Sequence, residues 1–257
     1  MSAALQQASV IRSRRAILDR AELVCRPGRL STFVGPNGAG KSTALKLLTG
    51  SLKPDQGSVT LDGEALPSIA PLALAKRRAF VAQTPLLSFP FQVHEVVAMG
   101  RTPYHGTTRA SDDEAVIDEV MGLLDIEGLA ERNYLTLSGG ERQRVNIARA
   151  LAQLWDHETT HTPWLFLDEP TSALDLKYQL RLMQLLRQLV KRDWGIVVVL
   201  HDLQLVQEYA HDVVLFQNGR LLGAGPVDQW LTPVTVQQVF ELEKPYALGA
   251  GSSSGAS

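Results

Sequence analysis

A glycine-rich run followed by a lysine and two hydroxyl residues is the part of this sequence best suited to chemistry. Residues 35–43 read Gly-Pro-Asn-Gly-Ala-Gly-Lys-Ser-Thr, the spacing of a phosphate-binding loop. A short apolar segment (30–34) reads as a buried strand before it, and residues 44–49 read as a helix after it. In that context backbone N–H groups and the helix N-terminus point at an anion. The predicted phosphate-binding residues are Gly35, Pro36, Asn37, Gly38, Ala39, Gly40, Lys41, Ser42 and Thr43.

Two side chains of this loop have separate expected roles. Lys41 would reach the β- and γ-phosphates of a nucleoside triphosphate, and Ser42 would place its hydroxyl on Mg²⁺. The alternative is a glycine-rich turn that carries a lysine by chance. Because spacing, strand and helix all agree, we expect a nucleotide site.

A second chemical feature is an apolar strand (165–167) that ends in two adjacent carboxylates, Asp168 and Glu169. A strand end beside a phosphate loop is where ligands bind in α/β sheets. We expect Asp168 to hold Mg²⁺ and Glu169 to polarise a water molecule for attack on the γ-phosphate. The alternative is a strand end with two solvated acids.

A third feature is a serine and two glycines, Ser138, Gly139 and Gly140, which precede a helix predicted over residues 142–154. They predict a second anion-binding helix N-terminus. Two such ends either serve one nucleotide within one chain, or each serves one half of a shared site. The second interpretation explains why neither end is complete alone.

These features lie on an expected α/β nucleotide-binding core (1–83 and 161–243) that is interrupted by a helical insertion (84–160). The pattern predicts short strands within 8–34, a hairpin after a strand at 58–61, a strand at 79–82 and a second hairpin over 213–222. The run 196–200 predicts a strand buried on both faces. Expected apolar helix faces are Val116, Val120 and Leu123; Ile147, Leu151 and Leu154; and Leu182, Leu185, Leu186 and Leu189.

Composition sets limits on the remaining possibilities. The 257 residues are 45% hydrophobic with a net charge of −2, which gives no indication of a nucleic-acid surface. Cys25 is the only cysteine, so no intramolecular disulfide is possible. We expect neither a secretory signal nor a membrane span, and therefore a cytoplasmic chain that needs a spanning partner for any membrane role. The tail, 244–257, is expected to be flexible.

The order of these motifs resembles that of the ATP-binding subunits of ABC transporters over residues ~8–242. Residues 35–43 match the Walker A loop, 165–168 the Walker B strand, Gln83 the Q-loop and 137–141 the signature. Residues 172–175 match the D-loop, which places Asp175 near the nucleotide, and His201 matches the switch histidine. The bland alternative for His201 is a strand-end histidine paired to Asp202.

The resemblance implies a P-loop α/β core with a mainly parallel sheet, an antiparallel β subdomain and an inserted helical subdomain. It also implies a head-to-tail dimer in which ATP lies between one chain's loop and the partner's Ser138 and Gly140. Gln83 would touch Mg²⁺ and relay the nucleotide state to a membrane subunit. His201 would hold the γ-phosphate and the attacking water.

The run Gly100-Arg101-Thr102-Pro103-Tyr104 is similar to the ATPases of importers for iron-siderophores, haem and vitamin B12. Residues 151–176 are most similar to the haemin-importer members of that branch. The resemblance implies an ATP-hydrolysing motor at the cytoplasmic face of the inner membrane, with two permease subunits and, indirectly, a periplasmic binding protein. Expected contacts to a permease are Pro90, Phe91 and Met99.

Two other functions stay open at this point. A soluble ABC ATPase could serve as an assembly scaffold, against which the Gly-Arg-x-Pro-Tyr run argues. A regulator could hold ATP without hydrolysing it, against which the presence of both Glu169 and His201 argues.

Two local patterns depart from the family. The aromatic residue that usually stacks on adenine is absent from residues 10–15, so we expect Arg12 or Arg14 to stack instead. The run His157-Glu158-Thr159-Thr160-His161 matches a zinc-protease pattern, but it precedes Pro163 and contains two β-branched residues. Because that pattern needs a helix, we expect a solvated loop rather than a zinc site.

Overall fold

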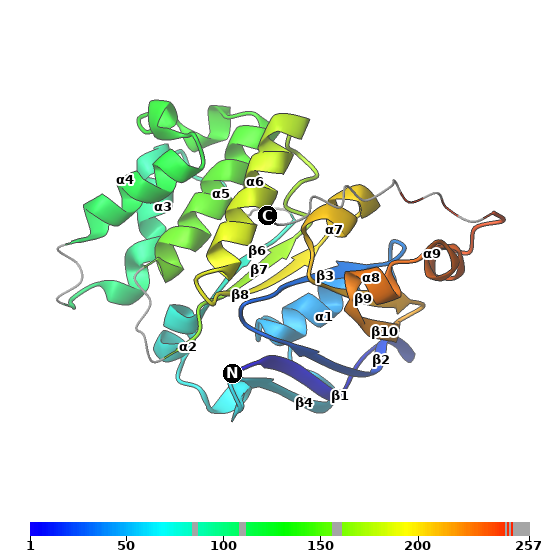
Figure 1. The fold of residues 1–257 in the computed structure, drawn as a ribbon. Helices are drawn as coiled ribbons and strands as arrows, with labels where there is room; N and C mark the ends of the chain where they lie inside the picture. Colours follow the sequence, from blue (N-terminus) through cyan, green and yellow to red (C-terminus); the bar gives the residue numbers. More distant parts are fainter. Residues whose placement is uncertain (84–86, 108–111, 156–160, 245, 247, 249–257) are drawn as a thin grey trace.

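The computed structural model describes residues 1–83, 87–107, 112–155, 161–244, 246 and 248. These residues form two β-sheets and a group of helices, arranged as Figure 1 shows. The strands are β1 (Ala3–Arg12), β2 (Arg15–Cys25), β3 (Leu30–Val34), β4 (Gln56–Leu61), β5 (Glu64–Ala65), β6 (Arg78–Val81), β7 (Trp164–Asp168), β8 (Gly195–Val199), β9 (Asp212–Gln217) and β10 (Arg220–Pro226). The helices are α1 (Lys41–Leu48), α2 (Pro71–Arg77), α3 (Val93–Ala98), α4 (Asp113–Leu123), α5 (Gly139–Leu154), α6 (Leu176–Val190), α7 (Leu203–Tyr209), α8 (Val227–Trp230) and α9 (Pro233–Phe240).

The larger sheet has the order β10-β9-β3-β8-β7-β6, and only its edge strand β10 is antiparallel to its neighbour. The smaller sheet, β2-β1-β4-β5, is antiparallel throughout. Phe33 pairs with Val199, and Leu167 pairs with Val198. Since parallel strands end at the same edge, this register brings the segments that follow β3, β7 and β8 together. The α/β architecture predicted from the sequence is confirmed.

Helix α1, which follows the phosphate loop, lies between the two sheets (Figure 1). It contacts β1, β2 and β4 on one side and β7 and β8 on the other. Leu45 and Leu48 on α1 belong to the same apolar cluster as Phe33 and Phe166 of the larger sheet. The predicted helix after the loop is confirmed, and it begins at Lys41 rather than Ala44.

The central strands are buried on both faces, as their continuous apolar runs predict. On β8, Ile196 and Val198 face one apolar cluster, whereas Val197 and Val199 face the other. Every residue of β7 and β8 is buried. Because both faces of these strands are packed, the strands are held in place in the sheet. The polar residues that follow each strand are therefore held at the edge of the sheet.

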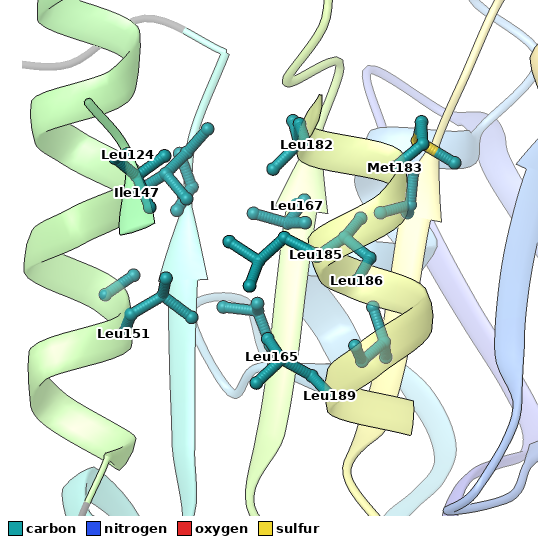
Figure 2. Packing of buried hydrophobic residues seen from close by; sticks show 14 of the residues in the cluster. Leu124, Ile147, Leu151, Leu165, Leu167, Leu182, Met183, Leu185, Leu186 and Leu189 are labelled. Carbon is teal, nitrogen blue, oxygen red and sulfur yellow. The ribbon is translucent and has the colours of Figure 1, made fainter. Parts of the chain in front are cut away.

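The helices α3, α4 and α5 pack together beside the larger sheet (Figure 1). Figure 2 shows Leu124, Ile147 and Leu151 from this group facing Leu165 and Leu167 of β7 and the leucines of α6. The predicted apolar faces on α5 and α6 are confirmed, because all of their named residues are buried. The face predicted on α4 is wrong in part: Leu123 is 41% exposed, and Ile117 and Met121 are buried in its place.

Two further elements begin earlier than the sequence predicts, and one helix was not predicted. Helix α5 begins at Gly139, not Arg142, because Ser138 and Glu141 form a capping box at its N-terminus. Strand β1 begins at Ala3 rather than within the predicted stretch from residue 8. Helix α2 was not predicted, although Pro71 occupies its first turn, where proline is well suited.

Candidate functional site

A cavity of about 490 Å³ lies where the phosphate loop meets the segments after β6, β7 and β8. It gathers most of the residues that the sequence singled out and adds one strand residue from β2. Its lining is Ile17, Asn37, Gly38, Ala39, Gly40, Lys41, Ser42, Thr43, Gln83, Glu169 and His201.

The loop backbone requires glycine at two points. Gly35 has φ +153°, and a Cβ there would lie 2.1 Å from the carbonyl oxygen of Phe216 on β9. Gly40 has φ +103°, and a Cβ there would lie 3.1 Å from the carbonyl oxygen of Ile17. Both positions favour glycine because L-residues rarely adopt these backbone angles. The loop is thus held against β9 and β2 while its N–H groups border the cavity.

Lys41 is only 5% exposed, and its Nζ donates to the carbonyl oxygens of Gly35 at 2.7 Å and Pro36 at 2.9 Å. Burial lowers the pKa of this ammonium, whereas the nearby carboxylates of Glu169 and Asp168 raise it. Phosphate oxygens in the cavity would compete with the two carbonyls for the same ammonium. Lys41 can therefore bind an anion without moving out of the loop.

Ser42, which lines the cavity, contacts the buried carboxylate of Asp168. The Ser42 hydroxyl donates to Oδ1 of Asp168 at 3.0 Å, and Asp168 is 3% exposed. Burial raises the pKa of Asp168 and the charge of Glu169 raises it further, while the Ser42 hydrogen bond lowers it. A hydroxyl beside a buried carboxylate is a set of hard oxygen ligands, which fits Mg²⁺ shared with phosphates.

Glu169 is the centre of a three-residue cluster. Its Oε2 accepts from Nε2 of Gln83 at 2.6 Å, and its Oε1 lies 2.6 Å from Nε2 of His201. Glu169 has φ +50°, so the chain leaves the strand direction directly after Asp168. The two adjacent carboxylates consequently face different groups, as expected for separate roles.

His201 has Glu169 rather than Asp202 as its partner. The Asp202 side chain instead caps α7, accepting from the backbone N–H groups of Gln204 at 2.8 Å and Leu205 at 3.2 Å. The alternative that paired His201 with Asp202 is therefore wrong.

The residues of the signature segment do not line this cavity. Ser138 caps the N-terminus of α5. Gly140 packs closely against the loop that precedes α6, where a Cβ on Gly140 would lie 2.9 Å from the carbonyl oxygen of Ala173. Asp175 caps α6 by accepting from the N–H of Tyr178 at 3.0 Å. Within one chain the two predicted anion-binding ends are thus kept apart, which favours the interpretation of a shared site.

Sequence reasoning missed Ile17, an ordinary apolar residue on a strand with no motif to mark it. Neither Arg12 nor Arg14 lines the cavity. Arg12 instead contacts Asp55 at 3.3 Å and the Ile11 carbonyl at 2.7 Å, both in its own surroundings. The stacking role expected of these arginines has no support in this arrangement.

The zinc-protease pattern lies mostly outside the described residues. His161, its last member, contacts Nη2 of Arg77 at 3.2 Å through its Nε2. Across the described ranges, no group of three or more His, Cys, Asp or Glu side chains is placed to hold a metal ion. Nor does any helix in those ranges have the length and apolarity to cross a membrane.

Comparison with known proteins agrees with this geometry. The family description "ABC transporter" matches residues 18–172. The chain is 43% identical to the "Hemin import ATP-binding protein HmuV" of Hahella chejuensis, with 91% of each protein covered. It is 45% identical to the protein of the same name from Escherichia coli O157:H7, covering 88% of this chain and 87% of that one.

A dimeric bacterial ABC transporter cassette, MJ0796, superposes with a TM-score of 0.75 at 26% identity, covering 88% of this chain and 98% of that one. The matched family segment includes the phosphate loop, Gln83, the signature and both carboxylates. The chain therefore belongs to the ABC transporter family and carries its ATP-binding domain.

Proposed function

We propose that this chain is the ATP-hydrolysing motor subunit of an importer for haem. The observation that carries hydrolysis is the Glu169 carboxylate, held by Gln83 and His201 at the edge of a phosphate-binding cavity. The names of the relatives from Hahella chejuensis and Escherichia coli support haem as the cargo. Iron-siderophores and vitamin B12 are the competing cargoes.

In the proposed reaction Glu169 accepts the proton of the water that attacks the γ-phosphate. Gln83 and His201 hold the two carboxylate oxygens in place, so that the base keeps its orientation. Lys41 and the loop N–H groups bind the β- and γ-phosphates. Ser42, Asp168 and Gln83 would hold Mg²⁺, which neutralises phosphate charge when it is bound.

The proposed active form is a head-to-tail homodimer. Ser138, Gly139, Gly140 and Asp175 of one copy would complete the site of the other, since these residues lie outside the cavity of their own chain. The dimeric MJ0796 cassette supports this arrangement. Two permease subunits at the cytoplasmic face of the inner membrane would receive the motion, and a periplasmic binding protein would supply cargo to them.

The proposed domain has a core (1–83 and 161–243), a helical subdomain (84–160) and a tail (244–257). Permease contact is proposed at Phe91 and Met99, which are half-buried, and at Pro90, which is exposed. Phe89 stands beside them, 68% exposed, with its ring centroid 6.2 Å from that of Phe91. Exposed aromatic groups of this kind suit a docking surface.

The test of the motor is Glu169→Gln, which keeps the shape and loses the base. We expect ATP binding to persist, turnover to fall at least 100-fold and an ATP-bound dimer to accumulate, with Glu131→Gln as the matched surface control. Turnover unchanged in Glu169→Gln would defeat the assigned role. Cargo is tested separately by growth of a deletion strain on haem as sole iron source, and normal growth there would exclude haem.

A further inference from the structure

A separate hollow of about 370 Å³ lies where helix α2 meets the short helix Met99–Tyr104. It shares no lining residue with the phosphate-loop cavity, and its volume lies in the range of small-molecule pockets in proteins. Two alanines of the α2 segment belong to its lining, together with Leu72, Lys76, Arg77, Tyr104 and His161. The hollow thus combines apolar side chains with three nitrogen-bearing ones, and no Asp or Glu is among these described lining residues.

Lys76 brings a charge that no carboxylate balances. Within the described ranges this lysine makes no ion pair, and it is half-buried. Its Nζ lies 5.3 Å from the ring centroid of Tyr104, a cation–π contact that keeps the ammonium at the wall of the hollow. Tyr104 is itself fixed, since it is 1% exposed and its hydroxyl donates to the carbonyl of Gln153 at 3.0 Å. The ammonium is therefore positioned to donate to an anion.

Arg77 contributes a second cation, which is held in one orientation. It is 9% exposed, its Nη1 donates to Oε1 of Glu64 at 2.5 Å, and its Nη2 lies 3.2 Å from Nε2 of His161. A guanidinium has more N–H donors than these two contacts use. Its Nε is buried and has no hydrogen-bond partner among the described residues. A buried N–H without an acceptor costs free energy, which an anion beside the guanidinium would offset.

His161 supplies a further donor. Because arginine can only donate, Nε2 of His161 accepts from Arg77, and the proton of the neutral ring then lies on Nδ1. Two backbone acceptors at the end of α2 are already engaged, because the carbonyls of Ala75 and Arg78 accept from Nε2 of Gln153 at 2.6 and 2.9 Å. The surroundings of the hollow are thus rich in free donors and poor in free acceptors.

We propose that this hollow binds a phosphate group carried on a partly apolar molecule. Lysine and arginine together bind phosphate through charge and charge-assisted hydrogen bonds. Leu72, which is 59% exposed, and the two alanines provide a surface for the apolar part. This chemistry fits a soluble phosphate ester or the headgroup of an anionic phospholipid. The site is independent of ATP hydrolysis in the other cavity.

The first test titrates the nucleotide-free, full-length protein with inorganic phosphate. Lys76→Gln removes the unbalanced charge of the hollow, whereas Lys41→Ala removes that of the phosphate loop. We expect two classes of phosphate site in the parent, of which Lys76→Gln weakens one about tenfold and Lys41→Ala weakens the other. Lys53→Gln changes neither, because this exposed lysine lines neither cavity.

Two further variants separate the role of the charge from damage to the fold. Lys76→Arg keeps the cation and should keep the phosphate affinity. His161→Gln, on a different segment, should weaken the same class of site several-fold. Both Lys76→Gln and His161→Gln should bind ATP as the parent does, since neither residue lines the phosphate-loop cavity.

The second test identifies the source of the phosphate by co-sedimentation with vesicles. Binding to phosphatidylglycerol vesicles and not to phosphatidylcholine vesicles, reduced about tenfold in Lys76→Gln and by competing inorganic phosphate, would identify a lipid headgroup. Phosphate binding at the hollow without binding to either vesicle would identify a soluble ester. The proposal is overturned if Lys41→Ala abolishes all phosphate binding and neither Lys76→Gln nor His161→Gln alters binding of phosphate or vesicles.

Discussion

At the scale of single residues, the phosphate loop is shaped as much by its neighbours as by its ligand. Gly35 lies directly under the carbonyl of Phe216, so its missing side chain lets β9 approach the loop. Gly38 also has a positive φ (+76°), but a Cβ there would meet nothing within 4 Å. Gly35 is therefore required by close packing as well as by its backbone angle, whereas Gly38 is required by its backbone angle alone.

This contrast predicts unequal costs for two alanine substitutions. Gly35→Ala forces a Cβ against a backbone carbonyl that cannot rotate away, and we expect it to lower the free energy of unfolding by about 3 kcal/mol. Gly38→Ala meets only the backbone penalty, about 1 kcal/mol. Urea denaturation of the two variants measures the difference. Equal losses would mean that the approach of Phe216 does not constrain the loop.

At the scale of elements, the sequence predicts long apolar runs well. A short continuous apolar run such as that of β8 fits a strand buried on both faces, and the leucines of α6 follow a clear helical period. Leu123 was misplaced because the buried face of α4 runs through Val116, Ile117, Val120 and Met121 to Leu124, and Leu123 falls at its edge. The sequence prediction chose the correct helical period but placed the centre of the apolar face wrongly.

The junction between α5 and α6 shows a contact that motifs do not reveal. The Arg144 guanidinium lies 4.0 Å from the ring centroid of Tyr178, and its Nη1 donates to the carbonyls of Leu124, at 2.8 Å, and Asp125. The Tyr178 hydroxyl donates to Oδ2 of Asp125 at 3.0 Å. One tyrosine therefore links the helix behind the signature to the helix behind Asp175.

We predict that Tyr178→Ala weakens ATP-driven dimerisation, because the signature helix loses its fixed position relative to α6. Cation–π contacts of this kind are worth about 1 kcal/mol, which corresponds to a several-fold weaker dimer in the Glu169→Gln background. Tyr178→Phe is the matched control, since it keeps the ring under Arg144 and loses only the hydroxyl. Analytical ultracentrifugation with ATP measures the dimer. The same dimer affinity in Tyr178→Ala and the parent would contradict the linkage.

At the scale of the whole molecule, the candidate site combines segments that lie far apart in the sequence. The motifs predicted Lys41, Ser42, Asp168, Glu169, Gln83 and His201 in one place, because strand ends of a parallel sheet share an edge. A hollow of about 420 Å³ beside the cavity, whose walls include Ile17, Asn218 and Phe240, could not be predicted. It depends on how β2, the turn after β9 and the end of α9 pack together, and no local sequence pattern determines that packing.

The same dependence on packing appears at His211, which joins three elements at the other end of the sheet. Its Nδ1 accepts from the backbone N–H of Leu30 at 2.9 Å, and its Nε2 lies 2.8 Å from Nη1 of Arg187 on α6. Burial lowers the pKa of His211 from 6.5, the charges of Arg187 and Arg29 lower it further, and Asp212 raises it. The folded protein thus resists protonation of this ring.

A lowered pKa in the folded state makes stability depend on pH in one direction. Above pH 6.5 the ring is neutral in both states and the contribution is fully present. As pH falls below that value, the His211 ring takes up a proton in the unfolded chain but remains neutral in the folded chain, so the free energy of unfolding decreases.

His211→Gln removes this titration and leaves every other histidine in place. Urea denaturation should therefore show a smaller loss of stability between pH 7.5 and 5.5 in His211→Gln than in the parent. Equal losses in the two proteins would show that His211 takes up its proton without opening the contacts to Leu30 and Arg187.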